Sequence, residues 1–251
     1  MKQKGEIGAE TRFQVSLPTP LAVLTVFIAE SSQEAVEPAL EAGFLHELEQ
    51  ILAGIPHDQL AIQWDVAVEF GILETNMPFY VRDKKAGIIE RLIRLGYAVP
   101  DGVELGYHLC YGNMGLKHFK EPEDTGLIVE IANPLFAGVQ RPINWIHLPV
   151  PIDRDDDAYF APLKGLKRPT GTQVFLGLVH LADGLEGTRR RMATASRFIQ
   201  DYGIGSECGM SGRPEGWRRR CWPCIAPWPR RPEARRALIS GTAHISVRRK
   251  L

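Results

Sequence analysis

Short apolar runs alternate with longer amphipathic segments along residues 1–210. The short runs are typical of strands buried on both faces, and they lie within 13–28 and at 60–66, 103–110, 127–131, 144–150, 173–180 and 204–208. The longer segments place apolar residues three and four positions apart, which predicts helices at 34–52, 84–95 and 188–202. Because strands alternate with helices, the pattern predicts an α/β fold with a parallel sheet.

Polar and chemically reactive residues stand at the carboxyl ends of the predicted strands. They are Asp65, Cys110, Glu130, His180 and Cys208. In a (β/α)8 barrel the carboxyl ends of the strands hold the active site, so this placement favours a TIM-type barrel. The chain offers seven candidate strands, and its N-terminal segment opens directly into the first of them. We therefore expect a barrel that is incomplete at its N-terminus.

Residues 211–251 depart from this pattern in both periodicity and charge. They contain eleven Lys and Arg but two Asp and Glu, whereas residues 1–210 contain nineteen and twenty-eight. Three of the five tryptophans and five of the eighteen prolines also lie there, with no helical or strand spacing. We predict an α/β barrel domain at 1–210 and, at 211–251, a basic tail that is disordered or translated out of frame.

Two functional interpretations of this tail carry less support. Arginines and tryptophans are the residue types that bind phosphates and stack on bases in a nucleic-acid-binding arm. Cys221 and Cys224 form a Cys-x-x-Cys pair, but a zinc site of that type needs a second pair nearby. We therefore favour neither nucleic-acid binding nor a metal site in the tail.

The composition predicts a globular protein without a membrane span. The chain is 44% hydrophobic and 24% charged, and it contains no apolar run of about 18 residues, the length that a spanning helix needs. The polar N-terminus lacks the apolar core of a signal peptide. Four widely spaced cysteines do not form a disulfide framework. These features predict a cytoplasmic protein with reduced thiols, which favours metal binding or catalysis by cysteine.

Four residues combine into a candidate metal site: His108, Cys110, Glu130 and Cys208. His108 and Cys110 are two positions apart on a predicted strand, so their side chains point to the same face. One imidazole, two thiols and one carboxylate are the donor types of a tetrahedral zinc site. The alternative is an α/β protein in which the cysteines are small core residues and the histidine is hydrogen-bonded and inert.

The motifs around these four residues resemble a known family. Tyr-His108-Leu-Cys110-Tyr resembles the His-x-Cys strand in the catalytic barrel of cobalamin-independent methionine synthase. Leu-Ile-Val-Glu130-Ile resembles the strand of that family whose glutamate is a zinc ligand, and Glu-Cys208-Gly-Met resembles its Asp-Cys-Gly-Leu, whose cysteine is another. The resemblance spans residues 60–212, and it implies that all four residues bind Zn²⁺.

Two further strand ends resemble functional positions of the same family. Ile-Gln-Trp-Asp65 resembles the strand whose aspartate contacts the amino group of homocysteine, and Leu-Val-His180 resembles the strand whose histidine lies near the methyl-transfer centre. The resemblance thus implies methyl transfer from a donor such as methyl-tetrahydrofolate to a zinc-activated thiol, homocysteine or a similar small molecule. Asp65 would bind the substrate ammonium, and His180 would supply a proton to the leaving amine. His147 is a second candidate for that proton transfer.

The sequence also departs from the family. Val66-Ala-Val follows Asp65 where the family has glutamate and proline, and the long N-terminal half of the family's enzyme has no counterpart. We therefore interpret the chain as a divergent, short member of the wider methionine synthase and uroporphyrinogen decarboxylase-like superfamily. Two alternatives stay open: a decarboxylase-like or binding relative without zinc, and a degraded fragment that catalyses nothing.

Overall fold

One sheet forms the centre of the molecule in a computed structural model that describes residues 2–5, 7–112, 117–208 and 244–246. Its strands pair in chain order. The parallel strands are β1 (Phe13–Pro18), β2 (Leu60–Val66), β3 (Glu104–Leu109), β4 (Trp145–Pro149), β5 (Gln173–Val179) and β6 (Tyr202–Ser206). Strand β7 (His244–Ser246) pairs antiparallel with β6. The predicted α/β fold with a parallel sheet is confirmed.

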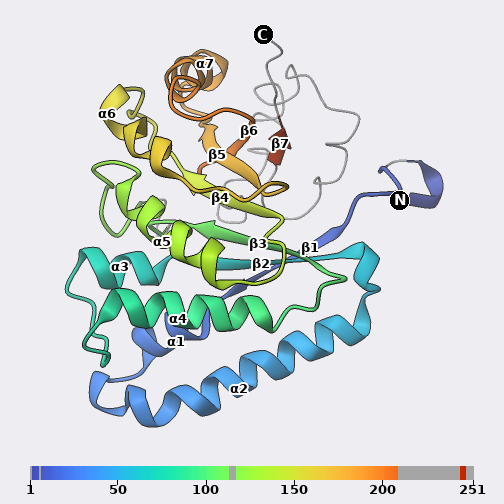
Figure 1. The fold of residues 1–251 in the computed structure, drawn as a ribbon, viewed down its shortest axis with the longest axis vertical. Coiled ribbons are helices and arrows are strands. Elements are labelled where there is room, and N and C mark those ends of the chain that lie inside the picture. Colours follow the sequence, from blue (N-terminus) through green and yellow to red (C-terminus); the bar gives the residue numbers. More distant parts are fainter. Residues whose placement is uncertain (1, 6, 113–116, 209–243, 247–251) are drawn as a thin grey trace.

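Helices connect the parallel strands and lie along one side of the sheet (Figure 1). The α-helices are α1 (Pro20–Phe27), α2 (Glu30–Gly54), α3 (Val68–Glu74), α4 (Lys84–Tyr97), α5 (Gly126–Gly138), α6 (Asp157–Phe160) and α7 (Gly184–Ala195). Short 3-10 helices are η1 (Lys2–Lys4), η2 (His57–Gln59) and η3 (Ala161–Gly165). Crossovers between parallel strands are right-handed, so a strand order that never reverses puts every helix on the same side.

The main hydrophobic core lies between the sheet and these helices. Two aromatic side chains show which face of the strands points there: Trp64 Nε1 donates to Leu95 O of α4 at 3.2 Å, and the Tyr107 hydroxyl donates to Leu92 O of α4 at 2.9 Å. Because successive side chains alternate between faces, the neighbours of these residues along β2 and β3 point to the opposite face. That opposite face carries the candidate functional residues Asp65 and His108.

The opposite face of the sheet is polar, with a small apolar cluster at one end. Ala61, Trp145 and Phe175 form this cluster. The indole of Trp145 lies flat over Gly106, where a Cβ atom would stand 1.9 Å from the ring. Glycine at 106 therefore allows the close approach of the indole, whose Nε1 reaches Gln63 Oε1 at 3.0 Å. The cluster supports the polar side chains above it, towards the carboxyl ends of the strands.

Most predicted elements are confirmed, and one is wrong. The helices expected at 34–52 and 84–95 are α2 and α4, and the strands expected at 60–66, 103–110, 144–150 and 173–180 are β2, β3, β4 and β5. The helix expected at 188–202 begins and ends earlier, as α7, so that β6 starts at Tyr202 rather than Ile204. Within 13–28, a strand is followed by a helix that begins after Thr19.

The segment 127–131, expected to be a strand, is part of helix α5. Asp124 Oδ1 accepts a hydrogen bond from Gly126 N at 2.6 Å, which starts the helix. Its buried residues, among them Ile128, Ala132 and Leu135, recur at helical spacing. A short apolar run cannot be assigned to strand or helix by periodicity, and here the continuation to Gly138 decides for the helix.

The structure bears on only part of the predicted barrel and of the predicted tail. Within the described ranges the sheet is open, with β1 at one edge and β7 at the other. Most of the predicted tail, residues 211–243 and 247–251 with Cys221 and Cys224, lies outside the described residues, and 244–246 form β7. No helix among the described residues is long and apolar enough to span a membrane.

A buried carboxyl lies where β1 and β2 end. Glu69, in the first turn of α3, is 1% exposed and accepts a hydrogen bond from the Thr19 hydroxyl. Its second oxygen, Oε2, is buried without a hydrogen-bond partner among the described residues. Burial raises the pKa of Glu69 from 4.5 to about 7, although the Thr19 hydrogen bond opposes the change.

We expect the wild type to lose stability relative to a Glu69→Gln variant as the pH rises. The folded state keeps a proton that the unfolded chain releases between pH 4.5 and about 7. The stability that this proton contributes is therefore complete below pH 4.5 and disappears as the pH rises through 7. Urea unfolding of both proteins at pH 5 and pH 8 should show a change of roughly 2–3 kcal/mol in their difference in unfolding free energy. An unchanged difference would show that the carboxyl is already ionised in the fold.

Candidate metal centre

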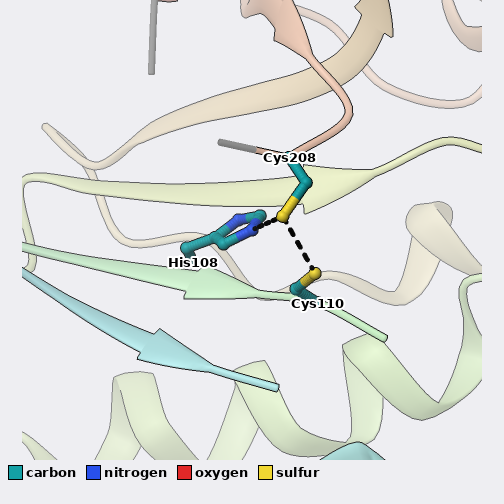
Figure 2. Close-up of side chains that lie close together, drawn as sticks. All are labelled: His108, Cys110 and Cys208. Atoms are coloured by element: carbon teal, nitrogen blue, oxygen red, sulfur yellow. Dashed lines mark hydrogen bonds between the residues drawn. The ribbon is translucent and has the colours of Figure 1, made fainter. Parts of the chain in front are cut away.

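Three of the four predicted ligands meet at the carboxyl end of the sheet. His108 lies in β3, Cys110 directly follows that strand, and Cys208 follows β6 (Figure 2). Cys208 Sγ lies 3.3 Å from His108 Nε2 and 3.5 Å from Cys110 Sγ. The three donor atoms all lie within 4.8 Å of one another. His108 and Cys110 share a face of the sheet, as their spacing predicts.

The position of Cys208 depends on the shape of the whole sheet. Strands β4 and β5 separate β3 from β6. Neighbouring strands lie about 4.8 Å apart, so in a flat sheet β3 and β6 would be roughly 14 Å apart. The contacts of Cys208 with His108 and Cys110 therefore require that the sheet curls and that the chain after β6 reaches back over the strand ends.

The donor set and its spacing fit zinc. Zn–S bonds of about 2.3 Å and Zn–N bonds of about 2.0–2.1 Å, at tetrahedral angles, separate two sulfurs by about 3.8 Å and a sulfur from a nitrogen by about 3.5 Å. The observed separations of 3.5 and 3.3 Å are slightly shorter, as expected for groups in direct contact. An imidazole with two thiols matches zinc better than calcium or magnesium, which prefer oxygen.

Both thiols of the cluster can ionise only if a cation binds between them. The hydrogen bond between Cys110 and Cys208, together with burial, raises the pKa of Cys110 well above its ordinary value. Burial alone would lower the pKa of His108, but Cys208 and Asp65 outweigh it and raise that pKa. Two thiolates at this spacing repel each other, so they ionise together only when a positive charge lies between them.

The turn after β3 wraps around one of the sulfurs. Gly112 N donates a hydrogen bond to Cys110 Sγ at 3.2 Å, and this bond favours the thiolate. Gly112 has φ = 86°, and a Cβ atom there would lie 2.6 Å from the Phe119 ring. Only glycine adopts this left-handed turn without strain and without displacing Phe119. The Tyr-Gly pair after Cys110 is a signal of such a turn that sequence reasoning did not use.

Glu130 does not join the other three residues. It lies on helix α5, its side chain is 57% exposed, and it pairs with Lys85 Nζ of α4. The predicted role as a fourth ligand depended on a strand at 127–131, and a helix puts that side chain on the outer surface instead. The structure therefore corrects the predicted set of four ligands to three.

Asp65 lies beside the cluster at the end of β2. Its register partner on β3 is His108, and burial raises its pKa against the opposing charge of His108. Gln63 Nε2 donates to Asp65 Oδ1 at 2.8 Å. The orientation of that amide is fixed, because the Trp145 indole can only donate and so must face Gln63 Oε1. Asp65 is thus held next to the candidate metal centre, as a substrate-binding residue would be.

His180 follows β5 and faces a carboxylate. His180 Nε2 lies 2.8 Å from Val150 O, and because a carbonyl only accepts, this nitrogen carries the hydrogen. The other nitrogen, Nδ1, lies 3.8 Å from Glu207 Oε2. Burial lowers the pKa of His180. The side chain is therefore a neutral base at pH 7, with Nδ1 directed towards the segment that carries Cys208.

Glu207 and His118 are site residues that sequence reasoning missed. His118 Nε2 lies 3.3 Å from Glu207 Oε1, and His118 Nδ1 lies 2.8 Å from Glu121 Oε2. Burial would lower the pKa of His118, but the two carboxylates outweigh it and raise that pKa to about 9. Glu207 stood beside a predicted ligand in the sequence, whereas His118 lies in a polar loop without a pattern.

His147, the second candidate for proton transfer, is fully buried in β4. Its ring stacks on the His108 ring with centroids 4.5 Å apart and an interplanar angle of 19°. This contact helps to orient the His108 imidazole. His147 is 0% exposed on β4, next to β3, and this burial suits support of a ligand better than contact with a substrate.

Comparisons of the chain with models of protein families, with curated proteins and with solved structures found no match.

Proposed function

We propose that His108, Cys110 and Cys208 bind a zinc ion and that the protein uses it to activate a small thiol for methyl transfer. The observation that carries this proposal is the convergence of one imidazole and two thiols from two segments a hundred residues apart. Buried cysteines that serve only as core residues have no reason to gather around a histidine nitrogen. The resemblance of these motifs to cobalamin-independent methionine synthase names the same chemistry.

We further propose that the sheet is part of an incomplete TIM-type barrel. Six parallel strands in unbroken chain order, with helices on one side, are the repeating arrangement of a (β/α)8 barrel. A doubly wound sheet would reverse its strand order. The contact between the ends of β3 and β6 supports the curvature that closure needs.

The number of protein ligands suits catalysis. Catalytic zinc sites use three protein ligands and leave a position for substrate, whereas structural sites are closed by four. A zinc ion at this site would lower the pKa of a bound thiol and keep its sulfur nucleophilic at neutral pH. Because Glu130 lies elsewhere, an incoming thiol displaces no protein side chain.

The residues around the cluster suit the remaining parts of the reaction. Asp65, held by Gln63, would bind a substrate ammonium through a charge-assisted hydrogen bond. In the overall reaction the thiol sulfur gains a bond to the methyl carbon, the bond from that carbon to the donor nitrogen breaks, and the thiol proton ends on the leaving amine. His180, a neutral base beside the site, is the side chain suited to carry that proton.

The test is methyl transfer by the zinc-loaded protein. With methyl-tetrahydrofolate as donor, homocysteine should be converted to methionine, and a Cys110→Ser variant should be inactive. Replacing Asp65 by asparagine should raise the KM for homocysteine by about 10–100-fold, the range for losing a hydrogen bond between charged groups. The KM for 3-mercaptopropionate, which lacks the amino group, should barely change. Zinc binding without transfer from this or simpler methyl donors would favour a non-catalytic relative.

A further inference from the structure

The side chain of Glu207 pairs with one histidine, His118, and lies near a second, His180, next to the candidate metal centre. Its Oε1 lies 3.3 Å from His118 Nε2, and its Oε2 lies 3.8 Å from His180 Nδ1. All three side chains are largely buried, with exposed fractions of 15% for Glu207, 8% for His118 and 10% for His180. A carboxylate shielded in this way interacts more strongly with its partners than a surface ion pair does.

The pair formed by Glu207 and His118 joins two of the segments that surround the candidate metal centre. His118 comes from the loop after β3, His180 from the end of β5, and Glu207 from the end of β6. Glu207 immediately precedes Cys208, and Ser206 Oγ donates to Cys208 O at 2.7 Å. The hydrogen bond within the segment fixes the shape of residues 206–208, and the Glu207 side chain ties this segment to the loop after β3.

Of the three candidate ligands, Cys208 depends most on such support. His108 and Cys110 are held by the ladder between β2 and β3, in which Cys110 N donates to Val66 O at 2.9 Å. Cys208 lies beyond the last residue of β6, and two strands separate β6 from β3. Without contacts of its own, the end of β6 would have to be ordered each time a metal binds.

We propose that Glu207 is a positioning residue that holds Cys208 within reach of His108 and Cys110 through its buried ion pair with His118. The proposal rests on the proposed metal site. Glu207 itself is not assigned as a ligand, because its carboxylate pairs with His118. Outer residues that orient metal ligands typically change metal affinity by about 10–100-fold when they are replaced.

The experiment is a Co²⁺ titration, because cobalt occupies zinc sites and its absorption reports thiolate ligands. The full chain with Cys221→Ser and Cys224→Ser serves as the parent, so that the only thiols left are Cys110 and Cys208. Glu207→Gln should bind Co²⁺ about 10–100-fold more weakly. Its thiolate-to-cobalt band, per bound ion, should fall towards that of Cys208→Ser. A loss of fold stability alone would not change this band.

The matched control is Glu121→Gln. Glu121 also pairs with His118, but its side chain is 70% exposed and contacts the far side of that imidazole. This variant should keep the parent's cobalt affinity and band. If Glu207→Gln fails to fold, His118→Asn removes the charged partner of Glu207 from another loop and should weaken binding in the same direction.

The outcomes separate the two proposals. A parent protein that binds no Co²⁺ would overturn the metal site and the proposed function. A parent that binds Co²⁺ with two thiolates, while Glu207→Gln matches it in affinity and band intensity, would overturn the positioning role alone. Equal weakening by Glu207→Gln and Glu121→Gln would also contradict it, because a general change of charge near the site would then explain the effect.

Discussion

Replacing Cys110 by serine is expected to weaken Zn²⁺ binding by about 10²–10³-fold. Structural zinc sites with four ligands bind with about 10–16 kcal/mol, or roughly 2.5–4 kcal/mol for each ligand, and about 1.4 kcal/mol corresponds to a factor of ten. A hydroxyl group does not ionise near neutral pH and binds zinc weakly. Competition with a chromophoric chelator measures the affinity of both proteins.

The control for this variant is Glu130→Gln, which separates three ligands from four. Because Glu130 is exposed on α5 and pairs with Lys85, its replacement should leave zinc affinity within about threefold of the wild type, the range of surface substitutions. A loss as large as that of Cys110→Ser would contradict the structure. The four-ligand set implied by the family resemblance would then be correct.

Replacing Arg191 by leucine is expected to lower the free energy of unfolding by about 3–5 kcal/mol, the range for breaking a buried ion pair. The Arg191 side chain is 0% exposed and binds both oxygens of Asp183, at 2.6 and 2.9 Å. It also donates to Leu178 O at 3.0 Å and to Ile152 O at 2.6 Å. Leucine would remove this donor from the Leu178 and Ile152 carbonyls and would break the ion pair with Asp183.

Arg190→Leu is the matched control, one residue away on the same helix. Its guanidinium is half exposed, with partners that include Asp155 and Asp183. Exposed pairs of this kind contribute about 0–1 kcal/mol. Urea unfolding of both variants therefore tests whether burial decides the effect. Similar losses in the two variants would contradict the account, in which Arg191 fixes the loop between β5 and α7 that carries His180.

Local spacing was enough to predict one half of the candidate site. His108 and Cys110 are two residues apart in a run predicted to be a strand, and the period of a strand puts them on one face. The position of Asp65 at the end of β2 follows from the same reasoning. These predictions needed no knowledge of how distant parts of the chain meet.

The other half depends on interactions that no local pattern contains. The apolar run around Glu130 reads equally well as a buried strand or as the first turns of a buried helix, and only the long extension to Gly138 separates them. Cys208 reaches the cluster because the sheet curls, which is a property of all the strands together. The link between Glu207 and His118 joins two loops whose sequences carry no periodicity.

Zinc K-edge X-ray absorption tests the central claim most directly. The sample is the full chain with Cys221→Ser and Cys224→Ser, loaded with one equivalent of zinc, so that sulfur in the first shell comes only from Cys110 and Cys208. We predict two sulfur neighbours at about 2.3 Å, with the remaining nitrogen or oxygen neighbours at about 2.0–2.2 Å. A shell of nitrogen and oxygen alone, or a folded protein that retains no zinc, would contradict it.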